Sequence, residues 1–233
     1  MLETSELISG YGKVPILQGV SMNIEKGEIV SIIGRNGVGK STFVKTLIGL
    51  NPVMKGEITY NGVSLNKKKS YERAWMGMGY VPQGHMVFPQ LTVKENLMMG
   101  EQINRLNPKK PDYDLIYEYF PILRERRDQK AGTMSGGQQA MLSMARVMTG
   151  NLELMLLDEP TEGVQPNIVD SIGDIILRIN KELGVTILLV EQHLGLIQNV
   201  SQRGYAMDKG RIVEPLTREQ IDDYEHIKKF LAI

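Results

Sequence analysis

The sequence predicts an α/β domain with a β-rich amino-terminal part and a helical insert. An apolar strand, a glycine-rich loop and a helix follow one another over residues 28–50, and strands alternate with helices again over residues 154–190. Between these stretches, residues 83–133 are rich in proline and polar side chains. We expect residues 1–82 and 134–233 to form one core, with 83–133 as a helical insert subdomain, because 233 residues suit a single domain of this kind.

The amino-terminal third is expected to be mostly β-structure around one helix. Apolar and polar residues alternate over 20–24, and the β-branched run 28–33 is typical of a buried strand. A helix should begin at about Lys40, since apolar residues recur from there at helical spacing, and Asn51-Pro52 should end it. Residues 56–65 read as a hairpin, because Asn61-Gly62 suits a tight turn.

The remaining elements follow from periodicity and capping signals. The expected elements are a strand at 79–82, helical stretches near 93–99 and 113–120, a helix from Ser135 or Gly136, strands at 154–157 and 185–190, a helix over 166–183, a hairpin over 204–214 and a last helix after the capping box Thr217-x-x-Gln220. In the helix over 166–183, one apolar stripe is expected to lie in the core: Ile168, Ile172, Ile175, Ile176, Ile179 and Leu183.

Composition excludes several classes of function. The 27 Lys and Arg residues balance 27 Asp and Glu residues, so no global charge favours nucleic acid or anionic lipid. The chain has no cysteine, which removes disulfides and thiolate metal sites. It shows no signal peptide and no apolar run of the roughly 20 residues that a membrane span needs. We expect a soluble protein whose contact with a membrane goes through a partner.

The most informative motif is a phosphate-binding loop of the form G-x-x-x-x-G-K-[ST]. Its residues are Gly34, Arg35, Asn36, Gly37, Val38, Gly39, Lys40 and Ser41. The glycines let consecutive backbone N–H groups point at phosphate, and the following helix presents its positive end to the same anion. Lys40 would bind the β- and γ-phosphates of a nucleoside triphosphate, and Ser41 would offer a hydroxyl to Mg²⁺.

Two carboxylates follow a later buried strand. The run 154–157 ends in Asp158 and Glu159, and ligands of open α/β sheets bind at the carboxyl ends of strands. We expect Asp158 to hold Mg²⁺ through water and Glu159 to polarise the water that attacks the γ-phosphate. Taken alone, the pair could also be a polar turn at a strand end.

A second predicted anion site lies about twenty residues before these acids. Ser135, Gly136, Gly137 and Gln138 stand at a predicted helix start, where backbone N–H groups and a hydroxyl can face an anion. A flexible helix start is the alternative for this motif alone. Together with the phosphate loop before it and the acids after it, the motif indicates a nucleotide-hydrolysing protein.

With these motifs in place, the chain resembles the ATP-binding subunits of ABC transporters over essentially its whole length. The matching residues are the phosphate loop extended to Thr42, Gln83 at the start of the insert, Ser135–Gln138, Asp158 and Glu159; Tyr11 matches the aromatic residue that stacks on adenine. The segments 80–97, 158–166 and 189–193 look like the branch that imports branched-chain amino acids and urea. Within it, the chain looks most similar to the second ATPase of urea or short-chain amide importers.

The resemblance implies an activity and a set of partners. It implies an ATP hydrolase that uses ATP and Mg²⁺, with Gln83 contacting both nucleotide and metal, in a head-to-tail dimer with an identical or related ATPase subunit. The insert would contact a membrane permease on the cytoplasmic side of the inner membrane, served by an extracytoplasmic solute-binding protein. The cargo would be urea, a short-chain amide or a branched-chain amino acid. A soluble ABC-type ATPase acting as a mechanical switch is the alternative.

Three positions depart from the common family pattern. The family histidine that contacts the γ-phosphate aligns with Gln192, one residue before His193, and we favour Gln192 for that contact. A glutamine can hydrogen-bond a phosphate but carries no charge. Gln165 replaces the usual acid of the following loop, and Met134 replaces the common leucine before the signature Ser135–Gln138.

Overall fold

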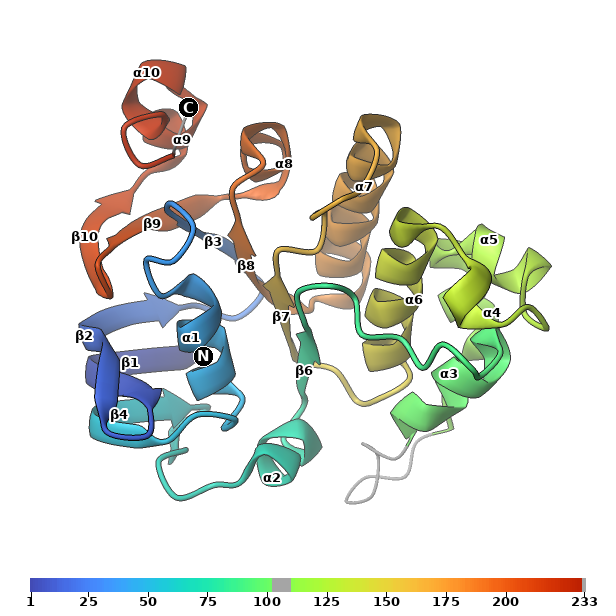
Figure 1. Cartoon of the computed structure of the whole chain (residues 1–233), viewed down its shortest axis with the longest axis horizontal. Coiled ribbons are helices and arrows are strands. Elements are labelled where there is room, and N and C mark those ends of the chain that lie inside the picture. The colour runs from blue at the N-terminus through green and yellow to red at the C-terminus, as the bar shows by residue number, and fades with distance from the viewer. Residues whose placement is uncertain (102–109, 232–233) are drawn as a thin grey trace.

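Two β-sheets and the helices around them form the structure, a computed structural model that describes residues 1–101 and 110–231 (Figure 1). An antiparallel sheet has the order β2-β1-β4-β5. A second sheet has the order β10-β9-β3-β8-β7-β6, in which β6 to β9 and β3 run parallel and β10 is antiparallel. The mixed sheets and flanking helices confirm the predicted α/β class.

The strands and helices have the following bounds. The strands are β1 (Leu2–Tyr11), β2 (Val14–Ile24), β3 (Ile29–Ile33), β4 (Val53–Tyr60), β5 (Val63–Ser64), β6 (Met78–Val81), β7 (Leu154–Asp158), β8 (Thr186–Glu191), β9 (Arg203–Asp208) and β10 (Arg211–Leu216). The helices are α1 (Lys40–Leu47), α2 (Ser70–Trp75), α3 (Val93–Gly100), α4 (Tyr113–Tyr119), α5 (Pro121–Glu125), α6 (Gly136–Met148), α7 (Pro166–Leu183), α8 (Leu194–Val200), α9 (Arg218–Asp222) and α10 (Tyr224–Ile227).

The parallel strands are buried on both faces, and their alternating side chains divide the core. Leu154 and Leu156 of β7 pack with α1 and the antiparallel sheet, whereas Met155 and Leu157 pack with α6 and α7. Successive side chains of a strand point to opposite faces, so a continuous apolar run supplies two cores at once. This packing fixes the carboxyl ends of β3, β7 and β8 beside one another.

Most predicted elements are confirmed, and the differences are local. The helix over 166–183 has the expected bounds, and Thr217 caps α9 as expected. Helices α2, α5, α8 and α10 were not predicted. Leu183 was expected in the core, but its side chain is 40% exposed because it lies in the last turn of α7, where the helix leaves the sheet.

Helices α3, α4 and α5 lie beside α6 on the side away from the antiparallel sheet (Figure 1). Val93 and Leu97 of α3 belong to the same buried cluster as Leu142 and Met144 of α6. The three helices fall inside residues 83–133, and the subdomain boundary itself stays a prediction. The helix α6, which we assigned to the core, therefore also packs against the insert.

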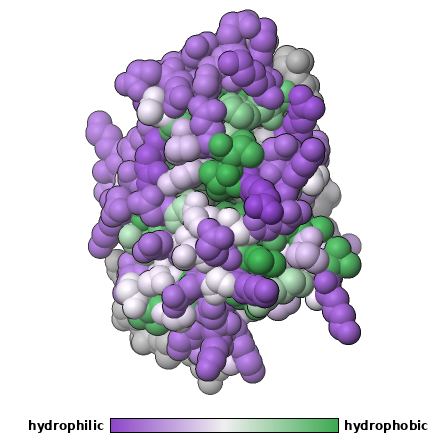
Figure 2. All heavy atoms as spheres, turned by 90° about the vertical axis from the view of Figure 1, so that its left-hand side faces the viewer, coloured by the Kyte–Doolittle hydropathy of each residue, from purple (hydrophilic) through white to green (hydrophobic). Residues whose placement is uncertain are grey.

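The opposite side of the molecule, with the antiparallel sheet and the carboxyl-terminal hairpin, is mainly hydrophilic (Figure 2). Hydrophobic side chains show on that face only in small groups. Among the described residues, none of the helices has the length and apolar character that crossing a bilayer requires.

Candidate nucleotide-binding site

The phosphate loop connects the carboxyl end of β3 to the start of α1. Gly37 and Gly39 have φ angles of 79° and 114°, which residues with a Cβ rarely adopt, so the sequence needs glycine there. Gly39 occupies the N-cap of α1 without a side-chain cap, which leaves the first N–H groups of the helix free for an anion. The loop backbone thus has the shape of an anion-binding nest.

Lys40 is folded back over its own loop and faces a carboxylate. Its Nζ donates to the carbonyl oxygens of Gly34 at 2.8 Å and Arg35 at 3.0 Å. The same Nζ lies 3.3 Å from Oε1 of Glu159, and the two side chains are only 3% and 5% exposed. The two side chains thus form a buried ion pair beside the phosphate loop.

Ser41 and Asp158 meet at the end of β7. The Ser41 hydroxyl donates to Oδ1 of Asp158 at 2.8 Å, and the Tyr80 hydroxyl donates to Oδ2 at 3.1 Å. Burial raises the pKa of Asp158 above its ordinary value, and these two hydrogen bonds offset only part of that rise. The expected proximity of the acids to the phosphate loop is confirmed.

The carboxylate of Glu159 contacts three polar side chains. Oε2 accepts weak hydrogen bonds from the side-chain amides of Gln83 at 3.3 Å and Gln192 at 3.4 Å, while Oε1 faces Lys40. The Glu159 backbone is left-handed, with φ of 50°, and its N–H donates to the Val190 carbonyl at 2.8 Å. Such a conformation is uncommon for glutamate and is typical of functional sites.

These groups border an open cavity of about 330 Å³. Among the predicted residues, its lining consists of Tyr11, Asn36, Gly37, Gly39, Lys40, Ser41, Thr42, Gln83 and Glu159. Tyr11 is 51% exposed, and the Thr42 side chain is the main cause that lowers its pKa, so the ring lies beside the phosphate loop. An exposed aromatic face next to such a loop can stack on a base.

Other predicted residues lie beside this cavity or away from it. Gly34, Arg35 and Val38 belong to the loop but do not line the cavity, and Asp158 lies just behind Ser41. Gln192 reaches Glu159, whereas His193 caps α8 by accepting from the Leu196 N–H at 3.2 Å. Gln192 therefore lies beside Glu159 and His193 does not, while the contact of Gln192 with the γ-phosphate stays a prediction.

The signature Ser135–Gln138 forms the first turn of α6, and none of its residues lines the cavity. Ser135 and Gln138 form a capping box: Gln138 N–H donates to Ser135 Oγ at 3.4 Å, and Ser135 N–H donates to Gln138 Oε1 at 3.2 Å. Ser135 and Gly136 are exposed. Within one chain, the predicted second anion site therefore lies outside the cavity at the phosphate loop.

Sequence reasoning missed two residues at the site. Tyr80 reaches Asp158, and its place one residue before the end of β6 was the available signal. Glu191 is buried, and its Oε1 accepts from the N–H groups of Gln192 at 3.2 Å and His193 at 3.1 Å. Burial raises the pKa of Glu191. Its carboxylate fixes the backbone that carries Gln192.

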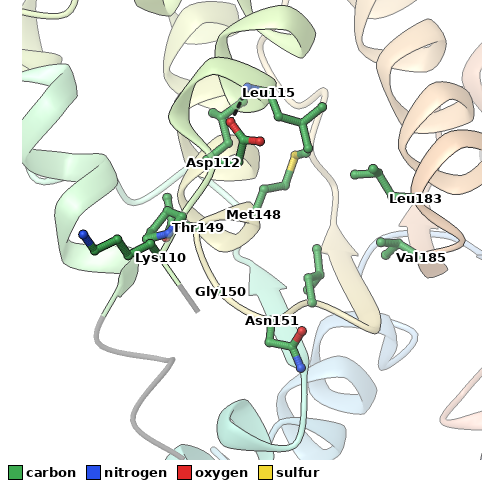
Figure 3. Close-up of a pocket in the computed structure, with 12 residues that line it drawn as sticks. Lys110, Asp112, Leu115, Met148, Thr149, Gly150, Asn151, Leu183 and Val185 are labelled. Atoms are coloured by element: carbon green, nitrogen blue, oxygen red, sulfur yellow. Dashed lines mark hydrogen bonds between the residues drawn. The ribbon is translucent and has the colours of Figure 1, made fainter. Parts of the chain in front are cut away.

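A different cavity of about 270 Å³ lies between α4 and the ends of α6 and α7 (Figure 3). Leu152 and Val185, which line it, come just before β7 and β8, so this cavity is at the amino ends of the strands. Asp112 there accepts from the Leu115 N–H and caps α4. Ligands of such sheets bind at the opposite, carboxyl ends, which favours the cavity at the phosphate loop.

The profile of the ABC transporter family matches residues 17–162, which include the phosphate loop, the signature and the two acids. The chain belongs to this family. It is 41% identical to the high-affinity branched-chain amino acid transport ATP-binding protein BraG of Pseudomonas aeruginosa, with 91% of each chain covered. It is 35% identical to the probable branched-chain amino acid transport ATP-binding protein LivF of Archaeoglobus fulgidus, over 98% of this chain and 97% of that one.

A solved structure of a nucleotide-free ATP-binding cassette from an ABC transporter is similar over 99% of this chain and 96% of its own, with a TM-score of 0.85 at 27% identity. These comparisons confirm the predicted class, an ATP-binding subunit of the ABC family in the branched-chain amino acid branch, over the soluble non-transport alternative. Urea or short-chain amides as cargo stay a prediction.

Proposed function

We propose that this chain binds and hydrolyses ATP and thereby drives import through a membrane permease. The observation that carries the proposal is the constellation at the carboxyl ends of β3 and β7. There, a glycine-shaped anion loop, Lys40 and Glu159 line one open cavity, and Asp158 lies just behind Ser41. This set can hold a triphosphate and place a carboxylate beside its last phosphate.

Binding would begin with Lys40. The Nζ atom already has two carbonyl oxygens and a carboxylate as neighbours, so an incoming phosphate can replace the carboxylate without exposing the charge to an apolar surface. Tyr11 would stack on the adenine, and Thr42 with the loop N–H groups would bind phosphate oxygens.

The residues Ser41 and Asp158 also fit a magnesium ion. Their oxygens lie 2.8 Å apart, and Mg²⁺ prefers oxygen ligands. Among the described residues, no cluster of three or more acidic or histidine side chains could hold a metal alone, so phosphate oxygens and water would complete the shell, with Gln83 near it. Bound there, Mg²⁺ would neutralise charge on the β- and γ-phosphates.

Hydrolysis would then depend on Glu159. Once phosphate has taken Lys40, the Glu159 carboxylate keeps its amide neighbours Gln83 and Gln192, which hold it in place. From there it accepts a proton from, or polarises, the water that attacks the γ-phosphate. Gln192 has an amide that can also hydrogen-bond that phosphate.

An apolar groove of about 400 Å³ supports the permease as partner. It lies between the core and the proposed insert subdomain (83–133), and its exposed hydrophobic side chains include Leu50, Tyr71, Phe88 and Met99. Exposed apolar side chains gathered in a groove are typical of protein interfaces. A permease segment seated there would hold the chain at the cytoplasmic side of the inner membrane, below the solute-binding protein. Because the related BraG and LivF are named for branched-chain amino acids, we propose that cargo class first and urea second.

A Glu159→Gln variant tests the function. It keeps the shape and the contact with Lys40 but removes the carboxylate, so ATP binding should persist while turnover falls by roughly 10²- to 10⁴-fold, the usual contribution of a positioned base. Binding is measured with a fluorescent ATP analogue and Mg²⁺, and turnover by phosphate release, both with the permease present.

The matched control is Glu182→Gln, an exposed glutamate on α7, which should hydrolyse ATP as the wild type does. Wild-type protein that neither binds Mg-ATP nor releases phosphate in the assembled complex would refute the proposed function. An active Glu159→Gln enzyme would refute only the assigned base.

A further inference from the structure

Arg146, in the last turn of α6, joins this helix to the segment that follows Gln83. Its Nη2 donates to the backbone carbonyl of Met86 at 3.0 Å. Its guanidinium lies over the Phe88 ring, with Cζ 5.1 Å from the ring centroid. Met86 and Phe88 thus both contact one side chain of α6, although Arg146 lies 58 residues after Phe88 in the sequence.

The surroundings of Arg146 are unusual for a cation. Among the described residues, no carboxylate lies within 4.0 Å of its nitrogens, and its Nη1 is buried without a hydrogen-bond partner. Burial lowers its pKa. Arg146 as a whole is only partly buried. Withdrawing part of a charge from water without an opposite charge still costs stability, and an apolar side chain could occupy the same space without that cost. What an arginine provides here, and an apolar side chain would not, is the hydrogen bond to the Met86 carbonyl and the cation–π contact with the Phe88 ring.

The segment that Arg146 holds leads directly to the proposed base. Gln83 donates to Glu159, and the next residues, Gly84, His85 and Met86, all have positive φ angles of 72°, 62° and 43°. Two consecutive residues with a Cβ seldom adopt this conformation, which persists only where neighbouring groups enforce it. The Arg146 bond to the Met86 carbonyl is one such constraint.

The other end of α6 carries the signature Ser135–Gln138. This helix has 13 residues and packs along buried side chains, so a displacement at Arg146 moves its first turn as well. Phe88 and Arg146 also both line the apolar groove. Three features therefore meet at Arg146: the groove, the segment after Gln83 and the signature helix.

We propose that Arg146 is a positioning residue that couples residues 83–88 to α6. Through it, a permease segment in the apolar groove sets both the place of Gln83 at Glu159 and the place of the signature turn. The inference rests on the proposed function, because it concerns how the permease regulates the same site.

The test compares Arg146→Met, which fills the space but removes the cation, with Arg146→Lys, which keeps a cation over the ring. Phe88→Leu removes the ring. The double variant of Arg146→Met and Phe88→Leu completes a double-mutant cycle, which measures the coupling between the two side chains. The matched control is Arg178→Met on α7. The Cζ atom of Arg178 lies 4.6 Å from the centroid of the Tyr119 ring, and this pair is remote from the site. The readouts are kcat and KM for ATP in the complex with the permease, permease stimulation of kcat, and the melting temperature.

We expect Arg146→Met to lower permease-stimulated kcat by about tenfold, as loss of a charged hydrogen bond predicts, with KM for ATP changed less than about twofold. Arg146→Lys should recover part of the stimulation, and Phe88→Leu should add little once Arg146 is replaced. Arg178→Met should retain full stimulation.

Stimulation of Arg146→Met within twofold of wild type would overturn the coupling role. The coupling role would also be overturned if kcat and ATP affinity fell by the same factor and in proportion to the melting temperature, because a purely structural role predicts that pattern. If Arg146→Met does not fold, Arg146→Lys and Phe88→Leu decide: wild-type stimulation in both overturns the inference. Wild-type protein without permease stimulation would refute the proposed function instead.

Discussion

Lys40 and Glu159 form a buried ion pair at the point where the terminal phosphate would bind. Two opposite charges taken out of water are costly unless each is well compensated. Here Lys40 also has two carbonyl partners, and Glu159 has two amides. The charges of the pair are therefore compensated within the site, and in the proposed binding mode a nucleotide would replace the carboxylate as the partner of Lys40.

Lys40→Ala should weaken ATP binding by roughly 10- to 100-fold, because a charged hydrogen-bond donor to phosphate is lost. The same change leaves Glu159 buried without its cation, so the free protein should also melt earlier. Isothermal titration with Mg-ATP and a thermal melt measure both effects. Lys181→Ala, a change on the exposed side of α7, is the control, and unchanged ATP affinity in Lys40→Ala would contradict the role of this lysine.

Gln192 and His193 can be separated by single replacements. His193→Ala removes a helix cap, which costs about 0.5–2 kcal/mol, so the melting temperature should fall while kcat is retained. Gln192→Ala should instead lower kcat with little change in melting temperature, since its amide reaches Glu159 only weakly at 3.4 Å. Phosphate release and thermal melts test this pair, and the reverse pattern would assign the γ-phosphate contact to His193.

At the residue level, local sequence motifs predicted the parts of the site that come from single segments. The phosphate loop and the strand ending in Asp158 are each continuous, so spacing and the strand-end rule were enough to predict that the two acids lie beside the phosphate loop, where the structure has Ser41 donating to Asp158. Tyr80 and Glu191 come from separate strands and have no motif of their own. Their contacts depend on strand order in the sheet, which periodicity does not give.

Among the elements, the start of α6 shows how two adjacent glycines differ. A Cβ on Gly137 would lie 2.6 Å from Ile168 Cγ2, a carbon of the neighbouring helix α7. A Cβ on Gly136 would meet only the Gly163 carbonyl, at 3.7 Å, an ordinary contact. Gly137 is thus required for packing, and Gly136 is left open toward solvent.

Gly137→Ala should therefore destabilise the protein by about 1–3 kcal/mol, the usual cost of overpacking a core. For a chain of this size, each kcal/mol lowers the melting temperature by roughly 2–4 °C. Gly136→Ala should melt like the wild type. Circular dichroism melts of the two variants in parallel give the comparison, and equal melting temperatures would contradict the packing difference.

The elements that sequence analysis missed are short and depend on tertiary contacts. Helix α2 has six residues, and its buried Arg73 bonds to the carbonyls of Thr46 and Leu47 at the end of α1. Helix α8 has seven residues and is capped by His193, which is not a usual capping residue. Long periodic segments such as α7 were predictable because one face of the helix is buried along most of its length.

On the scale of the whole molecule, the phosphate loop and the signature Ser135–Gln138, which would form two halves of one nucleotide site, do not meet within one chain. The phosphate loop borders a cavity, and the exposed first turn of α6 lies outside its lining. An isologous pair of chains would bring each loop to the other chain's signature and complete two sites at once. ATP between them would contribute much of the contact, which makes the dimer depend on nucleotide.

The Glu159→Gln variant should accordingly be monomeric without nucleotide and dimeric with Mg-ATP, since it binds ATP without consuming it. Light scattering during size-exclusion chromatography distinguishes a mass of 26.2 kDa from about twice that value. Adding Lys40→Ala should keep the protein monomeric, because the nucleotide no longer joins the half-sites. If the natural partner is a related ATPase, the variant alone stays monomeric and the mixture with that partner dimerises. Monomers in both samples at saturating Mg-ATP would contradict the head-to-tail arrangement, because the signature turn would then have no nucleotide to bind.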